Sequence, residues 1–454
     1  MNKVIDVLGT PYELTEELGE GGQGKVFAVS GGRYAVKLLS QKSNRETLRR
    51  RLQQVKLLPI QDLKIARPKA MLKPPRVGYI MEMVTGMTAI KTLMDIPVDP
   101  ELYVAGGGLK RRLLLLAQCA EILSRLHAHG LVYSDPSPGN IFVSKDADAY
   151  EVRLIDADNL HYESDSTSAI FTPRFGAPEL VKGTSGVNTL TDAYAFAVIA
   201  FQTLTLLHPL IGDWVNEGEP ELEDKAFQGE LPWIDDPDDT RNQTEAGFPR
   251  EMVLSPKLRK LSQRCFGEGL NDPLQRPSIS QWRDALYSAA NFTLHCPNCG
   301  STYYPNNQRI CPWCDTPQPL FVEVRIVRWE PEKGCCDGKD HIFHRLTLEP
   351  NSPLKLTTGL IKGRTGEAGN DPMVEVVLEE EKIKVRSMDD QSYWLTCDSY
   401  GTEKSASINR DKWRSFPIPK KQDEKYGRWR LHFNSLDIPH RLALFIDRSE
   451  SNGN

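Results

Sequence analysis

Three polar residues in the middle of the chain have the types and the spacing that phosphoryl transfer to a hydroxyl would need. Asp135 and Asn140 lie five residues apart in segment 131–143, which is typical of a loop between a helix and a strand, so their side chains can converge on one point. A carboxylate there could serve the hydroxyl nucleophile, and an amide oxygen could bind a metal. Asp156 follows Asn140 by sixteen residues, at the end of an expected strand, where its carboxylate suits Mg²⁺, a hard cation that prefers oxygen.

A glycine-rich segment and a lysine nearer the N-terminus could bind a polyphosphate. Gly19, Gly21, Gly24 and Val26 fit the pattern GxGxxGxV between two expected strands. Because glycine has no Cβ, backbone N–H groups can approach a phosphate closely at such a loop. Lys37 follows Gly24 by thirteen residues, inside an expected strand, and can bring one positive charge to the phosphates. Taken one at a time, the glycines also fit a plain hairpin, and the lysine also fits an exposed strand position.

The elements that must position these residues are short strands followed by helices. Apolar runs alternate with turns up to residue 84, and apolar residues then recur at helical spacing from Leu109 until Gly130, which ends that helix. The expected strands lie at 26–29, 34–39, 77–84, 141–143 and 152–155, and the expected helices lie at 45–58 and from 109 to Gly130, with more helices up to about 292. An insert between Asp213 and Asp239 holds eleven acids and one base, which indicates a solvated loop or a docking surface for a basic partner.

In this order, the motifs resemble those of a protein kinase, and the likeness covers roughly residues 12–292. The matching segments are the glycine loop, the VAIK-like Tyr34-Ala35-Val36-Lys37, the HRD-like Tyr133-Ser134-Asp135, the DFG-like Asp156-Ala157-Asp158, the APE motif Ala177-Pro178-Glu179, Asp192 at the start of a buried helix, and Arg276. The resemblance implies a bilobal protein-kinase-like fold of the α+β class. Residues 1–84 would form an N-lobe with the glycine-rich loop, and residues 85–292 would form a C-lobe with the catalytic loop and the acidic insert.

The resemblance also implies a role for each matching residue in a Ser/Thr protein kinase that uses Mg-ATP. Lys37 would hold the α- and β-phosphates, Asp135 would orient or deprotonate the acceptor hydroxyl, and Asn140 and Asp156 would bind Mg²⁺. The ATP-binding set would comprise Gly19, Gly21, Gly24, Val26, Lys37, and the backbone of Glu82 and Val84 after a gatekeeper Met81. Glu179 and Arg276 would form a structural ion pair.

Three departures from the family pattern keep other functions open. Ser134 replaces the HRD arginine, Ala157 replaces the DFG phenylalanine, and Ser137 replaces a lysine two residues after the catalytic aspartate. The first two favour a pseudokinase scaffold that binds nucleotide and partners, and the third favours a small-molecule phosphotransferase of the aminoglycoside-kinase type.

Because Ser134 offers no charge to a phosphate, phosphorylation of the loop that follows Asp156 is predicted to change activity little. The candidate sites are Ser164, Ser166, Thr167, Ser168 and Thr172.

The helix C glutamate of the family has one candidate here. Glu46 is the only acid between Lys37 and Asp62, and it follows Lys37 by nine residues, closer than the family pattern. We predict that Glu46 pairs with Lys37, with Gln53 or Gln54 as the alternative partner.

Two CxxC pairs indicate a metal site of a different kind. Cys296 and Cys299 are separated by eleven residues from Cys311 and Cys314, a spacing that lets four thiolates surround Zn²⁺ tetrahedrally. Four cysteines leave no open coordination position, so the predicted zinc ribbon at 293–318 is structural. Two disulfides or free thiols are the alternatives. A second cluster, Cys335, Cys336, His341 and His344, is better explained as ordinary residues, and the few bases around the ribbon make nucleic acid an improbable ligand.

Residues 319–454 are predicted to form a small antiparallel sandwich or barrel, an interaction domain. Expected strands lie at 321–327, 374–378, 382–385, 429–433 and 442–445. A weak likeness to a forkhead-associated sandwich rests on Gly363-Arg364 and Tyr393-Trp394-Leu395. The whole arrangement is similar to bacterial eukaryotic-like kinases of tellurite-resistance-like clusters. That resemblance implies a von Willebrand A-type protein and a metal-dependent phosphatase as partners beside the protein substrate.

Composition excludes several other classes. The 454 residues carry 56 basic and 61 acidic side chains, a formal charge of −5, so no global basic field favours nucleic acid. The most apolar stretch, 193–207, is interrupted by Gln202, Thr203 and Thr205 and is predicted to be a buried helix, not a membrane span. The first residues lack a signal-peptide layout, and nine cysteines with two CxxC pairs favour a reducing compartment, so a cytoplasmic protein is expected.

Overall fold

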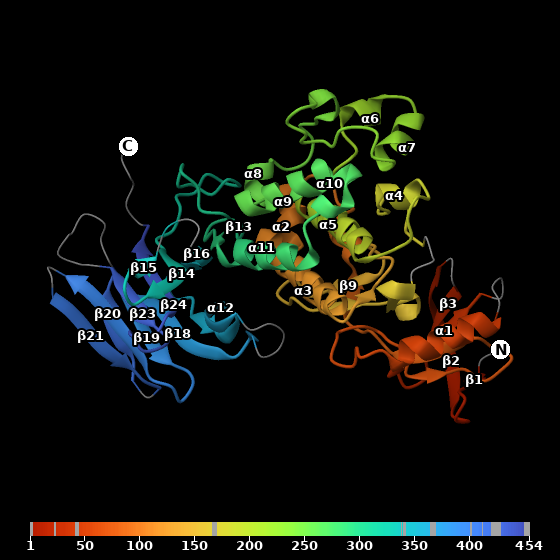
Figure 1. Ribbon diagram of the computed structural model, residues 1–454, viewed down its shortest axis with the longest axis horizontal. Coiled ribbons are helices and arrows are strands. Elements are labelled where there is room, and N and C mark those ends of the chain that lie inside the picture. The colour runs from red at the N-terminus through yellow and green to blue at the C-terminus, as the bar shows by residue number, and fades with distance from the viewer. Residues whose placement is uncertain are drawn as a thin grey trace. The chain divides into compact units, whose positions relative to one another are not determined.

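The structure is a computed structural model in which the chain folds into two compact units, residues 1–287 and 288–454. Figure 1 shows the elements of both units along the chain. The residues that the structure describes are 3–21, 24–40, 45–165, 170–336, 338, 342–363, 369–399, 402–410, 412–418 and 428–448.

An antiparallel six-stranded sheet with the order β1-β2-β3-β4-β6-β5 begins the first unit. Its strands are β1 (Lys3–Ile5), β2 (Pro11–Gly21), β3 (Gly24–Val29), β4 (Tyr34–Leu39), β5 (Ala70–Met71) and β6 (Gly78–Glu82). The helix α1 (Arg45–Leu57) packs on this sheet through Leu52, which lies in one apolar cluster with Leu39, Met71 and Tyr79. The three strands and the helix predicted here are confirmed, with ends that differ by a few residues.

Helices make up most of the rest of the first unit. They are α2 (Pro100–Ala105), α3 (Gly108–Ala128), α4 (Pro178–Val181), α5 (Thr189–Thr205), α6 (Asp213–Glu217), α7 (Glu221–Phe227), α8 (Arg250–Val253), α9 (Pro256–Phe266), α10 (Glu268–Asn271) and α11 (Ile279–Asn291). The apolar stretch predicted as a buried helix is α5, in which nearly every side chain is buried. The helix predicted to stop at Gly130 is α3, and Gly130 has a φ of 68°, a left-handed conformation that glycine adopts without strain.

Short strands lie between these helices and carry the loops of the candidate site. They are β7 (Met87–Ala89), β8 (Leu131–Val132), β9 (Ile141–Ser144), β10 (Val152–Leu154) and β11 (His161–Tyr162). The strands β9 and β10 form the hairpin that the sequence predicts, with Leu154 opposite Ile141. The short 3₁₀ helix η2 (Ala157–Asn159) follows β10 directly.

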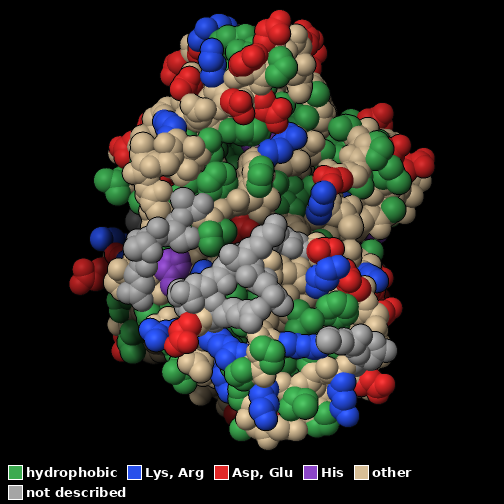
Figure 2. Space-filling view, turned by 90° about the vertical axis from the view of Figure 1, so that its right-hand side faces the viewer, with side chains coloured by type: hydrophobic (Ala, Val, Ile, Leu, Met, Phe, Trp, Pro, Cys, Tyr) green, Lys and Arg blue, Asp and Glu red, His purple; other side chains and the backbone are tan. Residues whose placement is uncertain are grey.

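The acidic insert is more ordered than a plain solvated loop. It contains α6 and α7, and Figure 2 shows Asp and Glu side chains gathered at the top of the view, the end of the unit where these helices lie. Three of its acids pair with bases of the same unit: Asp235 with Arg250 at 3.0 Å, Glu223 with Arg174 at 3.8 Å and Asp239 with Arg241 at 2.5 Å. A docking role for the insert stays a prediction.

The second unit contains an antiparallel sandwich, as predicted. A seven-stranded sheet has the order β15-β14-β24-β23-β20-β21, with β16 also paired to β14, and a four-stranded sheet has the order β17-β18-β19-β22. Its elements are β12 (Leu294–His295), β13 (Thr302–Tyr303), β14 (Val322–Glu330), β15 (Gly334–Cys336), β16 (Ile342–Leu348), β17 (Leu354–Thr357), α12 (Thr358–Lys362), β18 (Pro372–Glu379), β19 (Lys382–Ser387), β20 (Tyr393–Ser399), β21 (Thr402–Ile408), β22 (Arg414–Pro417), β23 (Trp429–His432) and β24 (His440–Asp447). Alternate residues of β14 and β18, such as Val324 and Val376, fill one apolar core. The strands β15, β16, β17, β20, β21 and β22 of the sandwich were not predicted.

None of the helices in the described part of the chain combines the length and the apolar character that crossing a membrane requires.

Candidate active site

A buried charged cluster lies where the sheet of the first unit meets η2. Lys37 on β4 has a side chain that is only 7% exposed, and its ammonium group forms ion pairs with Asp156 and, at 2.6 Å, with Asp158. The side chain of Asp158 is 3% exposed, whereas that of Asp156 is 24% exposed. The hydroxyl of Tyr79 on β6 donates a hydrogen bond to the second oxygen of Asp158.

Electrostatics in this cluster favour the charged form of the lysine. Burial works to lower the pKa of Lys37, but the carboxylates of Asp158 and Asp156 outweigh burial, so the pKa is raised. Burial raises the pKa of Asp158, and Lys37 is the neighbour that lowers it most. The carboxylate of Asp158 therefore depends on Lys37 to stay ionised.

The prediction that Glu46 pairs with Lys37 is wrong in this structure. Glu46 has a side chain that is 73% exposed, and it pairs with Arg50 on the surface at 3.0 Å. The physical reason is the phase of α1: Glu46 and the buried Val55 are nine residues apart, about two and a half helical turns, and so lie on opposite faces. The alternatives Gln53 and Gln54 are exposed as well.

A basic residue of α1 faces the site instead. The guanidinium of Arg51 donates to the side-chain oxygen of Asn159, in η2, at 2.6 Å. Arg51 and the buried Val55 are four residues apart and share one face of the helix, a spacing that could have revealed this contact from the sequence. The sequence interpretation also missed Asp158, although an acid stands there where the family motif has glycine.

The predicted pair Asp135 and Asn140 does converge. The side-chain amide of Asn140 donates to the backbone oxygen of Asp135 at 3.1 Å and lies 3.4 Å from its carboxylate. Thr172 also donates to this carboxylate, through its backbone N–H at 2.8 Å and through its hydroxyl at 2.9 Å. Burial raises the pKa of Asp135, and the hydrogen bonds from Thr172 work against that rise.

One buried carboxylate holds the backbone next to Asp135 in place through hydrogen bonds. Asp192 on α5 is fully buried and accepts hydrogen bonds from the backbone N–H groups of Tyr133 at 2.7 Å and Ser134 at 3.0 Å. Ser134 has a φ of 81°, a strained conformation for a residue with a Cβ, and its hydroxyl donates to the backbone oxygen of Asn159 at 2.9 Å. The residue in the place of the family arginine therefore tethers the catalytic loop to η2.

The glycine loop and the segment after β6, predicted to bind the nucleotide, belong to neighbouring strands of the first sheet or follow them directly. Gly24 has no room for a side chain, because a Cβ there would lie 2.1 Å from the backbone oxygen of Leu38. Val26 stands opposite Lys37 in the sheet. Gly19 and Gly21 belong to β2, and the two residues after Gly21 lie outside the described part. The side chain of Glu82 pairs with Lys69 and, at 3.5 Å, with Arg153, and Val84 follows directly after β6.

The predicted structural ion pair is present. Arg276 is buried and donates to both carboxylate oxygens of Glu179, at 2.7 and 2.8 Å. Such a bidentate pair ties α4 to the helices behind it and leaves no group free for chemistry.

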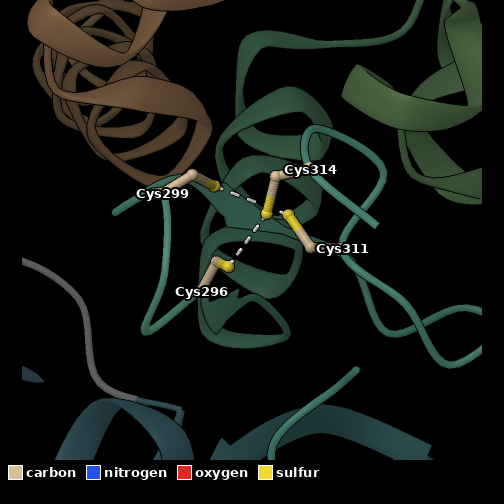
Figure 3. Close-up of side chains that lie close together, drawn as sticks. All are labelled: Cys296, Cys299, Cys311 and Cys314. Carbon is tan, nitrogen blue, oxygen red and sulfur yellow. Dashed lines mark hydrogen bonds between the residues drawn. The ribbon is translucent and has the colours of Figure 1, made fainter. Parts of the chain in front are cut away.

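The four paired cysteines of the second unit point toward one centre (Figure 3). Their sulfur atoms all lie within 4.8 Å of one another, with Cys296 and Cys314 at 3.6 Å and Cys299 and Cys311 at 3.7 Å. A tetrahedron with Zn–S bonds of about 2.3 Å has edges of about 3.8 Å, so the donor set fits Zn²⁺.

Two similar turns hold these cysteines. The N–H of Gly300 donates to the oxygen of Cys296, and the N–H of Asp315 donates to the oxygen of Cys311. Gly300 and Asp315 both have a positive φ. Among the described residues no other group of metal-ligating side chains gathers in this way, and His341 of the second predicted cluster lies outside them.

Comparison with known proteins identifies serine/threonine-protein kinases among the relatives of this chain. The chain is 28% identical over 228 residues to the DNA damage-responsive serine/threonine-protein kinase RqkA of Deinococcus radiodurans, covering 46% of this chain and 31% of that protein. It is 27% identical over 226 residues to serine/threonine-protein kinase PknB of Mycolicibacterium smegmatis, covering 45% and 34%. It is 26% identical over 312 residues to serine/threonine-protein kinase PknH of Mycobacterium tuberculosis, covering 63% and 46%.

The chain thus spans less than half the length of each of these relatives. A family model described as the protein kinase domain matches residues 12–288, the stretch that carries the lysine cluster, Asp135, Asn140 and the Glu179–Arg276 pair. Because this match covers more than half of the 454 residues, the chain belongs to the protein kinase domain family.

Proposed function

We propose that this chain is a Ser/Thr protein kinase, which transfers the γ-phosphate of Mg-ATP to a hydroxyl group of a protein. The observation that carries the proposal is the hydrogen bond from the Thr172 hydroxyl to the Asp135 carboxylate, at 2.9 Å. That distance is within the reach a general base needs, so a hydroxyl borne by a polypeptide fits against Asp135. Asn140, a possible metal ligand, lies beside it.

Each remaining polar group then has a task. Asp135 orients the acceptor hydroxyl and takes its proton, while Lys37 holds the α- and β-phosphates. Asn140 and Asp156 would hold Mg²⁺, which when bound offsets the negative charge of the phosphate oxygens. The partial exposure of Asp156, in contrast to the burial of Asp158, suits a carboxylate that must receive a metal from solvent.

The nucleotide would lie between the glycine loop and the segment after β6. Backbone N–H groups near Gly19, Gly21 and Gly24 would approach the phosphates, with Val26 against the adenine. The backbone groups of Glu82 and Val84 would pair with the adenine edge.

A nucleotide-binding pseudokinase scaffold is the second candidate. The exposed position of Glu46, which leaves Lys37 without a carboxylate from α1, favours it. The convergence of Asp135 and Asn140, and the pairing of Lys37 with Asp156, favour the enzyme.

Two substitutions separate the candidates. Asp135→Asn should lower phosphoryl transfer by about 100-fold or more while nucleotide affinity is retained, because Asp135 serves the acceptor. Asp156→Asn should weaken Mg-ATP binding as well, since it removes a metal ligand. The measurements are phosphosite mapping by mass spectrometry after incubation with Mg-ATP, and nucleotide-dependent thermal shift. Asp148→Asn, at an exposed loop position, is the control.

The outcomes are distinct. Transfer at the wild-type rate by Asp135→Asn would contradict the enzyme. Binding of Mg-ATP by the wild-type chain without any transfer would favour the scaffold.

For the second unit, we propose that Cys296, Cys299, Cys311 and Cys314 hold a structural Zn²⁺ in a ribbon at 293–318, followed by a β-rich interaction domain at 319–454. The sulfur positions support the metal, and the four ligands leave no position for substrate. A von Willebrand A-type protein and a metal-dependent phosphatase are proposed as partners from the sequence resemblance alone.

A further inference from the structure

Asp158 is held by two strands of the sheet at once. Its Oδ2 lies 2.6 Å from the ammonium group of Lys37 on β4, and its Oδ1 accepts a hydrogen bond from Tyr79 on β6. All three side chains are at least nine-tenths buried. A carboxylate in such a place is stable only if its partners are kept, because an unpaired buried charge is costly.

At this place the helix α1 carries a positive charge, whereas a partner of Lys37 must carry a negative charge. Arg51 is the residue of α1 that reaches η2, where it donates to Asn159, the neighbour of Asp158. Its positive charge interacts with the carboxylates of Asp158 and Asp156. The anion beside Lys37 therefore comes from η2, and the helix supplies a cation.

We infer that Asp158 is the positioning residue for Lys37: it holds the ammonium group in place for the nucleotide phosphates, a task for which α1 offers no carboxylate. This inference rests on the proposed function in so far as the phosphates are the ligand of Lys37. It assigns to the segment 156–158 two separate tasks. Asp156, the more exposed of the two acids, serves the metal, and Asp158 serves the lysine.

One consequence is that the lysine and the metal-binding carboxylate move together. Both acids belong to one short segment, so a displacement of α1 alone would not separate Lys37 from its partner. The hydrogen bond between Arg51 and Asn159 is one contact through which a movement of α1 could reach this segment.

A double-mutant cycle tests the inference. We expect Asp158→Asn and Lys37→Met each to weaken Mg-ATP binding by about tenfold or more, and the double variant to bind no more weakly than Lys37→Met alone, because Asp158 acts through Lys37. The measurement is titration of the full-length chain with Mg-ATP. Independent, multiplying losses would overturn the inference, and so would an Asp158→Asn affinity within twofold of wild type.

Matched variants separate positioning from stability. Asp6→Asn removes another buried carboxylate of the same sheet, one that accepts hydrogen bonds from Leu8, Thr10 and Tyr12. It should lower the melting temperature without changing nucleotide affinity. If Asp158→Asn does not fold, Asp158→Gly replaces it in the cycle, since glycine buries no unpaired amide. An affinity loss in Asp6→Asn equal to that in the Asp158 variant would overturn the inference.

A second measurement needs no nucleotide. In the wild-type chain, an amine-reactive acylating reagent should label Lys37 slowly, because its ammonium group is buried against Asp158. In Asp158→Asn the labelling rate of Lys37, followed by mass spectrometry, should rise several-fold, and in Asp6→Asn it should not change. An unchanged rate in Asp158→Asn would overturn the inference. If the wild-type chain does not bind Mg-ATP at all, the proposed function fails, but the labelling rates still test the pairing of Lys37 with Asp158.

Discussion

The two units each bury a cluster of opposite charges, and the clusters differ in whether a carboxylate remains exposed to solvent. In the first unit, one lysine faces two carboxylates, and one of these, Asp156, remains 24% exposed. In the second unit, the fully buried Glu323 on β14 accepts hydrogen bonds from Arg325 at 2.7 Å, Arg345 at 2.6 Å and Arg448 at 2.7 Å.

The difference indicates which cluster has capacity for a ligand. Burial alone would raise the pKa of Glu323, but the hydrogen bonds from Arg325 and Arg345 lower it to about 2, so the carboxylate is ionised and fully satisfied. Such a cluster holds strands together. In the cluster at Lys37, the carboxylate of Asp156 is partly exposed, so it can receive a cation such as Mg²⁺ from solvent. Buried charge alone does not mark a functional site, whereas a charged cluster with a solvent-exposed carboxylate is a candidate for one.

The largest effect should come from removing the metal site of the second unit. Cys311→Ser, or chelation, should destabilise the ribbon by about 10 kcal/mol, because zinc binding contributes that much to the folding of small metal sites. The cluster at Lys37 belongs to a unit with its own core, so nucleotide affinity should be unchanged. The measurements are zinc content by elemental analysis and thermal unfolding of the full chain, with Cys336→Ser as the control. Protein purified without chelators that contains no zinc would contradict the prediction.

Acid should affect the two units in different pH ranges. His208 in the first unit is buried and neutral, because its Nε2 donates to the oxygen of Arg174 and its Nδ1 accepts from the N–H of Leu210. Burial lowers its pKa from 6.5 to about 4. The unfolded chain binds a proton below pH 6.5 and the native chain only near pH 4, so stability present at neutral pH is lost across that window, by about 3 kcal/mol.

The measurement for His208 is urea unfolding between pH 7 and 4. His208→Gln should flatten the slope of unfolding free energy against pH, since glutamine does not titrate there. A slope equal to that of the wild type would show that other groups govern this range. Glu323, with its pKa lowered from 4.5 to about 2, should respond only below pH 4.5.

A smaller effect is expected from opening the cluster at Glu323. Glu323→Gln should lower the stability of the second unit by about 2 kcal/mol, a value within the range for hydrogen bonds to charged groups. The loss is moderate because the three arginines are partly exposed and can be hydrated. Nucleotide affinity should not change, and Glu332→Gln at an exposed position should do nothing. A loss of nucleotide affinity in Glu323→Gln would mean that the two clusters are coupled.

The smallest effect is expected in the loop after η2. Ser134 offers no charge to a phosphate, and its hydroxyl is already bonded to Asn159, so replacing the loop hydroxyls with alanine should change turnover by less than tenfold, about 1.4 kcal/mol. The positions are Ser164, Ser166, Thr167 and Ser168, of which the last three lie outside the described residues. Thr172 must be tested separately, because it contacts Asp135 directly. A larger loss with unchanged folding would show that this loop is a switch.

Local sequence patterns predicted much of the fold and several residues of the candidate site. The segment 34–39 is strand β4 as predicted, and the four cysteines converge as their spacing indicates. The convergence of Asp135 and Asn140 was also predicted, because five residues in a loop between a helix and a strand restrict where two side chains can lie. The sandwich of the second unit was predicted, but six of the eleven strands in its two sheets were missed, since short strands such as β22 carry little periodic signal.

Residue types and short spacings were enough to predict which residues are available for chemistry: a lysine in a strand, acids and an amide in loops, and four paired cysteines. Those features depend on residue type and short spacing, which local structure preserves. Which acid meets Lys37 depends instead on how distant segments pack. Glu46, nine residues away along the chain, is turned to solvent by the phase of α1, because burial of Leu52 and Val55 fixes the rotation of the helix. Asp158, far away in sequence, lies at 2.6 Å because β4, β6 and η2 pack together around a charge that none of them could bury alone.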